Sequence, residues 1–267
     1  MAREDWIKKS GDRRRWPGKI VIYFTISLRG ALIYSAGPMR IAEIFYSIQG
    51  EGKLMGVPSV FVRVSGCNLR CVWCDTPYAS WNPEGTEQSV QRIVEQVLET
   101  GARHVVITGG EPFIMKDLGE LCDELNQHNL HITIETAATL FEPVKLHLAS
   151  LSPKLSNSTP TARDGGRFAR GHEDHRLNLE VVQQFIDHSP DFQLKFVVTD
   201  PNDLGEIRDL LAKLRGWSSG DVLLMPEGTD RQTLDARAGW ISEICKRDGF
   251  RFCPRLHVML YGNKRGT

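Results

Sequence analysis

The alternation of strand-like and helix-like segments from Met39 onward is the feature that most restricts the fold of this chain. Short apolar runs predict strands at residues 60–64, 104–107, 131–134, 146–151, 194–198, 222–225 and 255–260. Apolar residues at three- and four-residue spacing predict helices at residues 87–100, 118–125, 177–187, 204–214 and 231–247. The polar stretch 152–176, which includes two adjacent glycines, is expected to form a long loop.

Strand–helix–strand repetition implies an α/β fold with a parallel sheet and right-handed crossovers. About six or seven such strands suit a partial β/α barrel, and a flat doubly wound sheet is the alternative. The length of 267 residues and the hydrophobic share of 41% fit one large α/β domain or two small ones.

Unusual polar residues follow nearly every predicted strand. The segments 65–67, 108–112 and 135–136 follow the first three strands, and the segments 152–154, 199–200, 226–228 and 262–264 follow the other four. Because the carboxyl ends of parallel strands share one edge of a sheet or one mouth of a barrel, these motifs are expected to converge on a single site.

Three of the six cysteines, Cys67, Cys71 and Cys74, lie in a short loop directly after a predicted strand. Their C-x3-C-x2-C spacing lets three thiolates hold three corners of a [4Fe–4S] cluster, so the fourth iron is free to bind a cofactor or substrate. Structural zinc would need a closed set of four ligands, and the sequence offers no second pair. A redox C-x2-C would not need the third cysteine, and an electron-transfer cluster would need a fourth.

At these residues the chain resembles the radical S-adenosylmethionine (SAM) superfamily, whose hallmark is this cysteine spacing. The resemblance implies a partial barrel in which SAM binds the open iron and is cleaved to methionine and a 5′-deoxyadenosyl radical. It also implies that the segment 109–112, Gly-Gly-Glu-Pro, holds the amino group of SAM. The expected SAM-binding residues are Trp73, Asp75, Gly110, Glu111, Glu135, Ser152, Pro153 and Lys154. For Glu135 and residues 152–154, an ordinary polar strand end is the alternative interpretation.

Further motifs, in order from about Met39 to the C-terminus, closely resemble the 7-carboxy-7-deazaguanine synthase family. These motifs are Ile48-Gln-Gly-Glu-Gly52, Phe61-Val-Arg63, Cys74-Asp-Thr76, Thr108-Gly-Gly-Glu-Pro112, Ser152-Pro-Lys154, Leu224-Met-Pro-Glu-Gly228 and the ending His257-Val-Met-Leu-Tyr-Gly-Asn-Lys-Arg-Gly266. The resemblance implies conversion of 6-carboxy-5,6,7,8-tetrahydropterin to 7-carboxy-7-deazaguanine with loss of ammonia, an early step toward queuosine. It also implies a substrate-bound Mg²⁺ with Thr76 as its protein ligand, which suits the few protein contacts that Mg²⁺ often makes.

The same resemblance supplies the substrate contacts. They are expected at Ile48, Gln49, Gly50, Glu51, Arg63, Thr108 and His257. Gln and Glu can pair with the donor and acceptor edge of a pterin, and Arg can hold a carboxylate with two hydrogen bonds. A solvated turn is the alternative interpretation of residues 49–52, and a packed strand residue is the alternative for His257.

Composition limits the partners and the compartment. Lys and Arg total 33, as do Asp and Glu, so charge gives no support for a nucleic-acid partner. No apolar run is long enough to span a bilayer, which argues against a membrane protein. An oxygen-sensitive cluster, with Cys122, Cys245 and Cys253 interpreted as buried thiols, favours a cytoplasmic protein.

Residues 1–38 match no motif of this family. We expect Met39 to be the natural start, so that residues 1–38 are a misassigned extension or a poorly ordered tail and the radical SAM domain spans residues 39–267. A secretory signal is the alternative, but Arg29 interrupts its apolar run.

Two other functions share some of these features. A glycyl-radical-enzyme activase has the same cysteine spacing but acts on a protein and would not need residues 49–52 or the Asp75-Thr76 pair. A non-catalytic iron–sulfur electron carrier would need neither an open iron nor the Gly-Gly-Glu motif. For the synthase, the family resemblance implies a homodimer and a flavodoxin or ferredoxin as electron donor.

Overall fold

The described residues form one sheet of nine strands, most of them parallel. The computed structural model describes residues 38–267, so the predicted extension 1–38 lies outside the described residues apart from Pro38. The parallel strands are β2 (Pro58–Val64), β4 (His104–Gly109), β5 (His131–Thr136), β6 (Leu148–Leu151), β7 (Phe192–Val198), β8 (Val222–Pro226) and β9 (Arg251–Phe252). Strand β1 (Met39–Ile48) pairs antiparallel with β2, and the short β3 (Thr86–Gln88) pairs antiparallel with β1.

The strand order decides between the two predicted architectures. Within the described sheet it runs β3-β1-β2-β4-β5-β6-β7-β8-β9, with β3 and β9 at opposite edges. From β2 onward each strand is added on the same side of the previous one, whereas a doubly wound sheet reverses its order at a switch point. Right-handed crossovers in one direction place the connecting helices on one face of the sheet. The fold is therefore an open, partial β/α barrel, as predicted.

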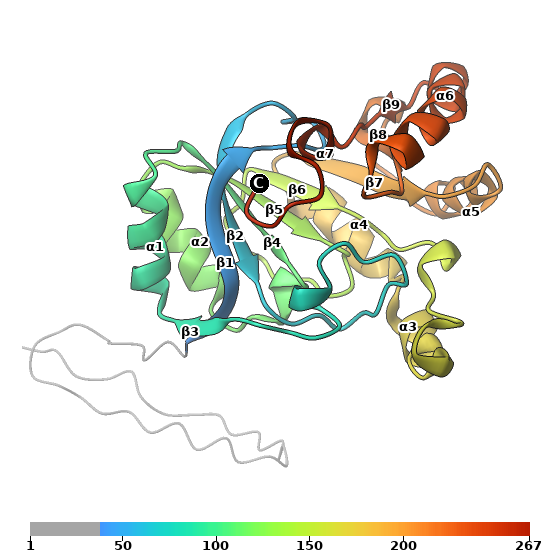
Figure 1. The fold of residues 1–267 in the computed structure, drawn as a ribbon. Helices are drawn as coiled ribbons and strands as arrows, with labels where there is room; N and C mark the ends of the chain where they lie inside the picture. The colour runs from blue at the N-terminus through green and yellow to red at the C-terminus, as the bar shows by residue number, and fades with distance from the viewer. Residues whose placement is uncertain (1–37) are drawn as a thin grey trace, which may run out of the picture. The chain divides into compact units, whose positions relative to one another are not determined.

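Seven α-helices are present in the described part of the chain. They are α1 (Val90–Glu99), α2 (Leu118–Gln127), α3 (Ala169–His175), α4 (Leu179–His188), α5 (Asp203–Leu211), α6 (Arg231–Asp248) and α7 (Leu256–Tyr261). Helix α1 contacts α2 and β1, and α6 contacts β8 and β9. In Figure 1, α5 and α6 lie to the right of β7 and β8. None of the described helices is long and apolar enough to cross a membrane.

Local sequence explains where the main helices begin and end. Ser89 accepts a hydrogen bond from the Arg92 backbone and Asp230 accepts one from the Thr233 backbone, so each side chain caps the first turn of its helix. Helix α6 ends at Gly249, whose φ of 72° is the left-handed conformation that glycine adopts without strain. The apolar faces of these helices pack on the buried strand residues in one continuous core.

Three predictions of secondary structure were wrong. Residues 256–260, predicted as part of a strand, belong to α7, because a short apolar run fits a turn or two of helix as well as a strand. Residues 87–88 belong to β3, and α1 begins after its cap at Ser89. The stretch predicted as a loop, 152–176, contains the helix α3 and two short 3₁₀ turns. In addition, the sequence analysis did not predict β1.

Candidate active site

One cavity of about 490 Å³ collects most of the predicted site residues at the carboxyl ends of the parallel strands. The predicted residues that line it are Ile48, Gln49, Gly50, Glu51, Arg63, Cys67, Cys71, Trp73, Cys74, Asp75, Thr76, Thr108, Gly110, Glu135, Ser152, Lys154 and His257. Glu111 and Pro153 are buried and do not line the cavity. The expectation that the polar motifs converge on one mouth is confirmed for segments 65–67, 108–112, 135–136, 152–154 and 262–264, whereas segments 199–200 and 226–228 do not line the cavity.

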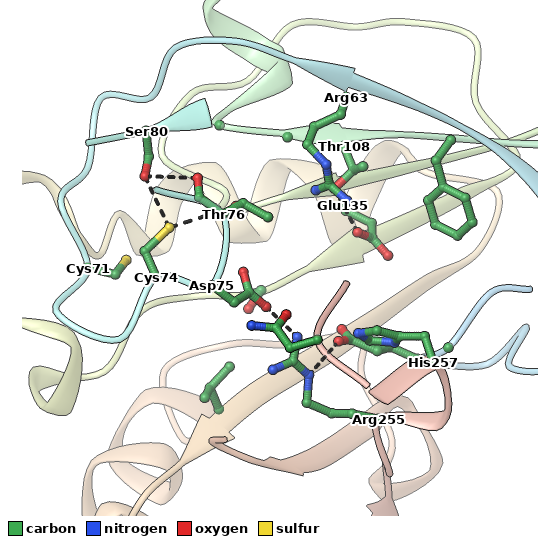
Figure 2. Close-up of a pocket in the computed structure, with 18 of the residues that line it drawn as sticks. Arg63, Cys71, Cys74, Asp75, Thr76, Ser80, Thr108, Glu135, Arg255 and His257 are labelled. Atoms are coloured by element: carbon green, nitrogen blue, oxygen red, sulfur yellow. Dashed lines mark hydrogen bonds and ion pairs between the residues drawn. The ribbon is translucent and has the colours of Figure 1, made fainter. Parts of the chain in front are cut away.

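The cysteine loop follows β2 and forms one wall of the cavity (Figure 2). Burial raises the pKa of Cys67 to about 11 and that of Cys71 to about 12, so both thiols keep their protons until a metal displaces them. Cys74 Sγ lies 3.0 Å from Ser80 Oγ and 3.8 Å from Thr76 Oγ1. Among residues 38–267, no three His, Cys, Asp or Glu side chains converge on a point where they could bind one metal ion. A [4Fe–4S] cluster accepts each thiolate at a separate corner, so three thiols spread along one wall fit a cluster.

The Gly-Gly-Glu motif joins the end of β4 to the cysteine loop. The Gly110 backbone N–H donates to Val64 O (3.1 Å) and the Glu111 N–H donates to Gly66 O (2.9 Å). A Cβ atom on Gly110 would lie 1.6 Å from Gly66 O, so only glycine allows this approach.

The Glu111 side chain is fully buried and bonded within the protein. Its carboxylate accepts hydrogen bonds from Thr136 Oγ1 (2.6 Å), the Ala137 backbone (2.9 Å) and the Phe113 backbone (3.2 Å). These bonds fully engage the buried carboxylate and fix the ends of β4 and β5 relative to each other. The expectation that Glu111 binds SAM stays a prediction; in this structure its carboxylate is bonded to residues 113, 136 and 137 and does not line the cavity.

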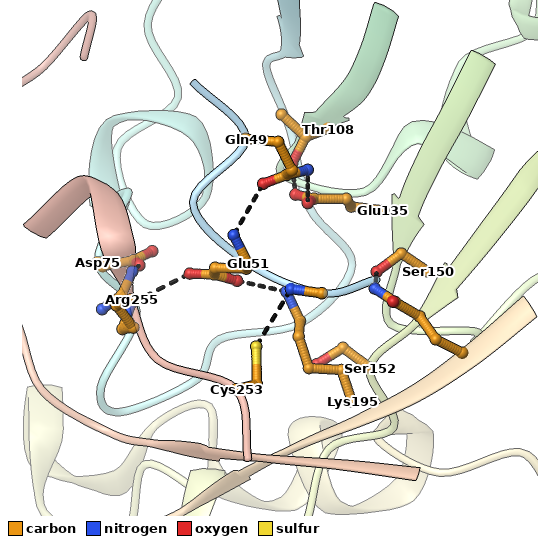
Figure 3. Close-up of polar contacts among 12 residues, drawn as sticks. Gln49, Glu51, Asp75, Thr108, Glu135, Ser150, Ser152, Lys195, Cys253 and Arg255 are labelled. Carbon is orange, nitrogen blue, oxygen red and sulfur yellow. Dashed lines mark hydrogen bonds and ion pairs between the residues drawn. The ribbon is translucent and has the colours of Figure 1, made fainter. Parts of the chain in front are cut away.

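A buried cluster of opposite charges forms a second wall (Figure 3). Glu51 pairs with Lys195 and with Arg255, whose Nε lies 3.0 Å from the carboxylate, and Arg255 also pairs with Asp75. Burial alone would raise the pKa of Glu51, but Lys195 and Arg255 outweigh it and hold that pKa well below its usual range. The pKa of Asp75 is also lowered, because Arg255 outweighs the effect of burial. Both carboxylates are therefore ionised around neutral pH.

Lys195 and Arg255 were missed by the sequence analysis, although Lys195 gave a signal. Lys195 interrupts the apolar run of β7, which is otherwise buried on both faces. A lysine at such a position is nearly always paired, so it could have been singled out. Arg255 was assigned to a strand that does not form, and its partners lie 180 and 204 residues away along the chain.

A network of neutral and acidic groups lies between these walls. Glu135 accepts from Gln49 Nε2 (3.1 Å) and from Thr108 Oγ1 (2.8 Å), and Gln49 Oε1 accepts from the Glu51 backbone (3.1 Å). Side chains from β4, β5 and the turn after β1 are therefore bonded into one acceptor-rich surface. The pKa of His257, next to this surface, is lowered by burial.

Arg63 and the C-terminal residues meet at a shared carboxylate. Arg63 Nε donates to Glu43 Oε1 (2.7 Å), which also accepts from Tyr78 OH (2.8 Å). Arg265 lies 3.2 Å from the other Glu43 oxygen, and its guanidinium lies 4.1 Å from the centre of the Tyr78 ring. This contact holds residues 263–267, all of which line the cavity, beside the arginine expected to bind substrate.

Comparisons with known proteins identify the chain's relatives. Residues 61–152 match the family model of the radical SAM superfamily. The chain is 44% identical to the 7-carboxy-7-deazaguanine synthase of Rhodopirellula baltica, over 87% of this chain and 90% of that protein. It is 45% identical to the enzyme of the same name from Halobacterium salinarum, over 86% of this chain and 94% of that protein.

A solved structure agrees with these relatives. The crystal structure of QueE from Escherichia coli superimposes with a TM-score of 0.64 at 25% identity, covering 82% of this chain and 94% of that chain. The resemblance expected from the sequence is confirmed, and the superfamily uses a [4Fe–4S] cluster together with SAM. The chain belongs to the 7-carboxy-7-deazaguanine synthase family of radical SAM enzymes.

Proposed function

We propose that the chain converts 6-carboxy-5,6,7,8-tetrahydropterin to 7-carboxy-7-deazaguanine with loss of ammonia. The observation that carries this proposal is the meeting of three thiols, the Gly-Gly turn and an acceptor-rich surface in one cavity. When bound, the cluster and SAM supply the radical chemistry, while the chain binds, orients and shields the reactants.

Cys67, Cys71 and Cys74 would hold the cluster. Lys154 faces the cysteine loop, with its ammonium bonded to Ser152 O and Ser152 Oγ (both 2.8 Å) and 5.8 Å from the centre of the Trp73 ring. A cation at this position favours the carboxylate of SAM. The Gly109–Gly110 backbone, which tolerates no side chain, would line the methionine part of SAM.

The remaining walls suit the substrate. Arg63 would bind the pterin carboxylate, because its Nη1 and Nη2 have no partner among the described residues. Glu51 and Glu135 are acceptors and suit the N–H donors of a pterin edge, with Gln49 and Thr108 holding Glu135 in position. His257 lies against Gly50, where a Cβ atom would be 2.1 Å from its Nδ1, so the backbone of residue 50 and the imidazole share one side of the site.

Mg²⁺ would bind at Thr76, whose hydroxyl lies on the cavity wall beside Cys74. Mg²⁺ prefers oxygen ligands and often keeps only one or two protein contacts, so substrate and water oxygens would complete its coordination. We further propose that the enzyme works as a homodimer and receives its electrons from a flavodoxin or ferredoxin.

The decisive experiment supplies every reactant at once. The protein is reconstituted anaerobically with iron and sulfide, then mixed with SAM, dithionite, Mg²⁺ and 6-carboxytetrahydropterin, and the products are identified by mass spectrometry. We expect 7-carboxy-7-deazaguanine; formation of only 5′-deoxyadenosine and methionine would show that the substrate assignment is wrong.

A matched pair of variants tests the cluster ligands in the same assay. Cys71→Ala should lose the cluster and the product. Cys122→Ala alters a thiol buried in α2, outside the cavity, and should retain both. A four-iron cluster retained by Cys71→Ala would contradict the ligand assignment.

A further inference from the structure

The backbone of the cysteine loop is held by a segment that lies about 90 to 100 residues further along the chain. The Arg70 N–H donates to His172 Nδ1 (3.1 Å), and the Val72 N–H donates to Ser158 O (2.8 Å). Arg163 Nη1 donates to Val72 O (2.9 Å). These partners all belong to residues 156–176, here named the cover segment, which the sequence predicted to be a loop.

His172 has only one arrangement of its protons in this contact. Its Nδ1 accepts from a backbone N–H, so its proton lies on Nε2 and is donated to Ser158 Oγ (2.9 Å). Ser158 Oγ in turn donates to Leu155 O (2.6 Å). The imidazole is 2% exposed, so water does not replace these partners.

Two stacked side chains, Trp81 and Arg163, hold the carbonyl groups of Cys71 and Val72 in the same loop. Trp81 Nε1 donates to Cys71 O (3.0 Å), and the Arg163 guanidinium lies 3.9 Å from the centre of the Trp81 ring. The Phe168 ring packs edge-on against Trp81, with centroids 5.6 Å apart, and the Arg70 guanidinium lies 5.5 Å from the Phe168 ring. Backbone groups of residues 70–72 are thereby fixed on the side of the loop away from the cavity.

We propose that the cover segment fixes the cluster-binding loop, with His172 and Arg163 as positioning residues that slow the loss of iron from the cluster. The inference rests on the cluster site proposed above. Ligand thiolates retain a cluster best when the backbone that carries them cannot rearrange, and partners beyond the ligands themselves supply this rigidity. Since Cys67, Cys71 and Cys74 still line the cavity, the cover segment leaves the open iron accessible to SAM.

The test compares iron retention with global stability. Wild type, His172→Leu and His172→Asn are reconstituted anaerobically, and the release of iron to a chelator is followed well below the unfolding temperature. We expect His172→Leu to release iron roughly tenfold faster, because one buried N–H loses its acceptor. His172→Asn places an amide oxygen near the position of Nδ1 and should restore much of the retention.

His104→Leu is the matched control. His104 is also a buried histidine bonded to two hydroxyl groups, Ser59 Oγ (2.5 Å) and Thr133 Oγ1 (2.8 Å), but it lies at the opposite end of β4 from the cavity. His104→Leu should lower the unfolding temperature and leave iron release unchanged. If both leucine variants lose iron in proportion to their loss of stability, the positioning role is overturned.

Arg163, which is only partly buried, keeps the proposal testable if His172→Leu does not fold. Arg163→Met removes the hydrogen bond to Val72 O, and Arg163→Lys retains a donor. We expect faster iron release from Arg163→Met than from Arg163→Lys, with an altered electron paramagnetic resonance signal of the reduced, SAM-bound cluster. If Arg163→Met released iron at the wild-type rate, the inference would be overturned. If the wild-type protein bound no cluster at all, the proposed function would be overturned instead.

Discussion

Among residues 38–267, the Arg63 side chain makes one hydrogen bond, to Glu43, and the substrate contact proposed for its other two nitrogens can be tested apart from its charge. Arg63→Lys keeps the charge but loses the planar pair of donors that matches a carboxylate. We expect the KM for the pterin to rise roughly tenfold or more, since a hydrogen bond between charged groups contributes about 1.5–3 kcal/mol. The measurement is steady-state kinetics at saturating SAM.

Arg92→Lys is the control for this substitution, because Arg92 is an exposed residue of α1 that pairs with Glu95. It should leave KM unchanged. An unchanged KM in Arg63→Lys would remove Arg63 from the substrate site.

Thr76 is the single residue proposed to contact Mg²⁺, and its hydroxyl can be removed or retained by small substitutions. Thr76→Ala should weaken the activation by Mg²⁺ while sparing SAM binding, because only the hydroxyl oxygen is lost. Thr76→Ser keeps that oxygen and should respond like wild type. Product formation is measured over a range of Mg²⁺ concentrations, and superimposable curves for Thr76→Ala and wild type would argue against the assignment.

At the scale of elements, the junction between β4 and the cysteine loop depends on the absence of a side chain at Gly110. A Cβ atom there would lie 1.6 Å from Gly66 O and 2.6 Å from Ala79 O, both of them backbone atoms. We therefore expect Gly110→Ala to displace the cysteine loop, reduce the iron bound per chain and lower the unfolding temperature. Iron analysis and thermal unfolding measure the two effects.

Gly239→Ala is the contrasting substitution. Gly239 lies exposed within α6, and a Cβ atom there would contact nothing within 4 Å. Alanine should stabilise this helix by up to about 1 kcal/mol and leave iron binding unchanged. If Gly110→Ala bound iron and unfolded like wild type, the proposed close approach would be wrong.

Elements with a clear local pattern were predicted from the sequence. Strand β4 is an apolar run, and α1 shows its buried residues at three- and four-residue spacing. Strand β1 was missed because its burial follows no strict alternation and its existence depends on pairing with β2. Helix α7 was mistaken for a strand because a short apolar run does not distinguish a turn or two of helix from a strand.

Site residues that lie within sequence motifs were predicted. Site residues that come together only through folding, from distant parts of the chain, were missed. The cysteine loop and the Gly-Gly turn are each one unbroken stretch of sequence, so both could be recognised directly. The family resemblance placed Arg63 and Glu51 in the substrate site. By contrast, Lys195 meets Glu51 across 144 residues, a contact that only the folded sheet creates. For Glu111, the motif does not reveal that its carboxylate bonds to Thr136 and to the backbone of residue 137.

At the scale of the whole molecule, the buried ion pairs tie the two ends of the described chain together. Glu51 follows β1, whereas Arg255 precedes α7 near the C-terminus. Because the folded pKa of Glu51 is lowered from about 4.5, the stability that its ionisation contributes is complete above that pH and is lost as the pH falls below it. Loss of Arg255 alone would leave the buried Glu51 with Lys195 only and Asp75 without an ion pair among the described residues, which is destabilising.

Buried histidines also make the stability of the whole protein depend on pH, in a range above that of Glu51. Burial lowers the pKa of His104 to about 4, well below the value of 6.5 in an unfolded chain. As the pH falls from 6.5 toward 4, the unfolded state therefore takes up a proton that the folded state refuses, and stability decreases. The pKa of His172 is also lowered to about 4 by burial, so it contributes with the same sign.

We expect the free energy of unfolding of the metal-free protein, measured with urea, to be lower at a pH of about 5 than at about 7.5. This range lies above the one in which Glu51 contributes, and the buried Glu111, whose pKa is raised by burial, acts with the opposite sign, so a decrease in stability reports the buried histidines. His104→Gln removes one of these groups and should make the pH dependence shallower. His128→Gln alters an exposed histidine at the end of α2 and should leave the slope as in wild type. Equal slopes for wild type and His104→Gln would show that His104 does not resist protonation in the folded chain.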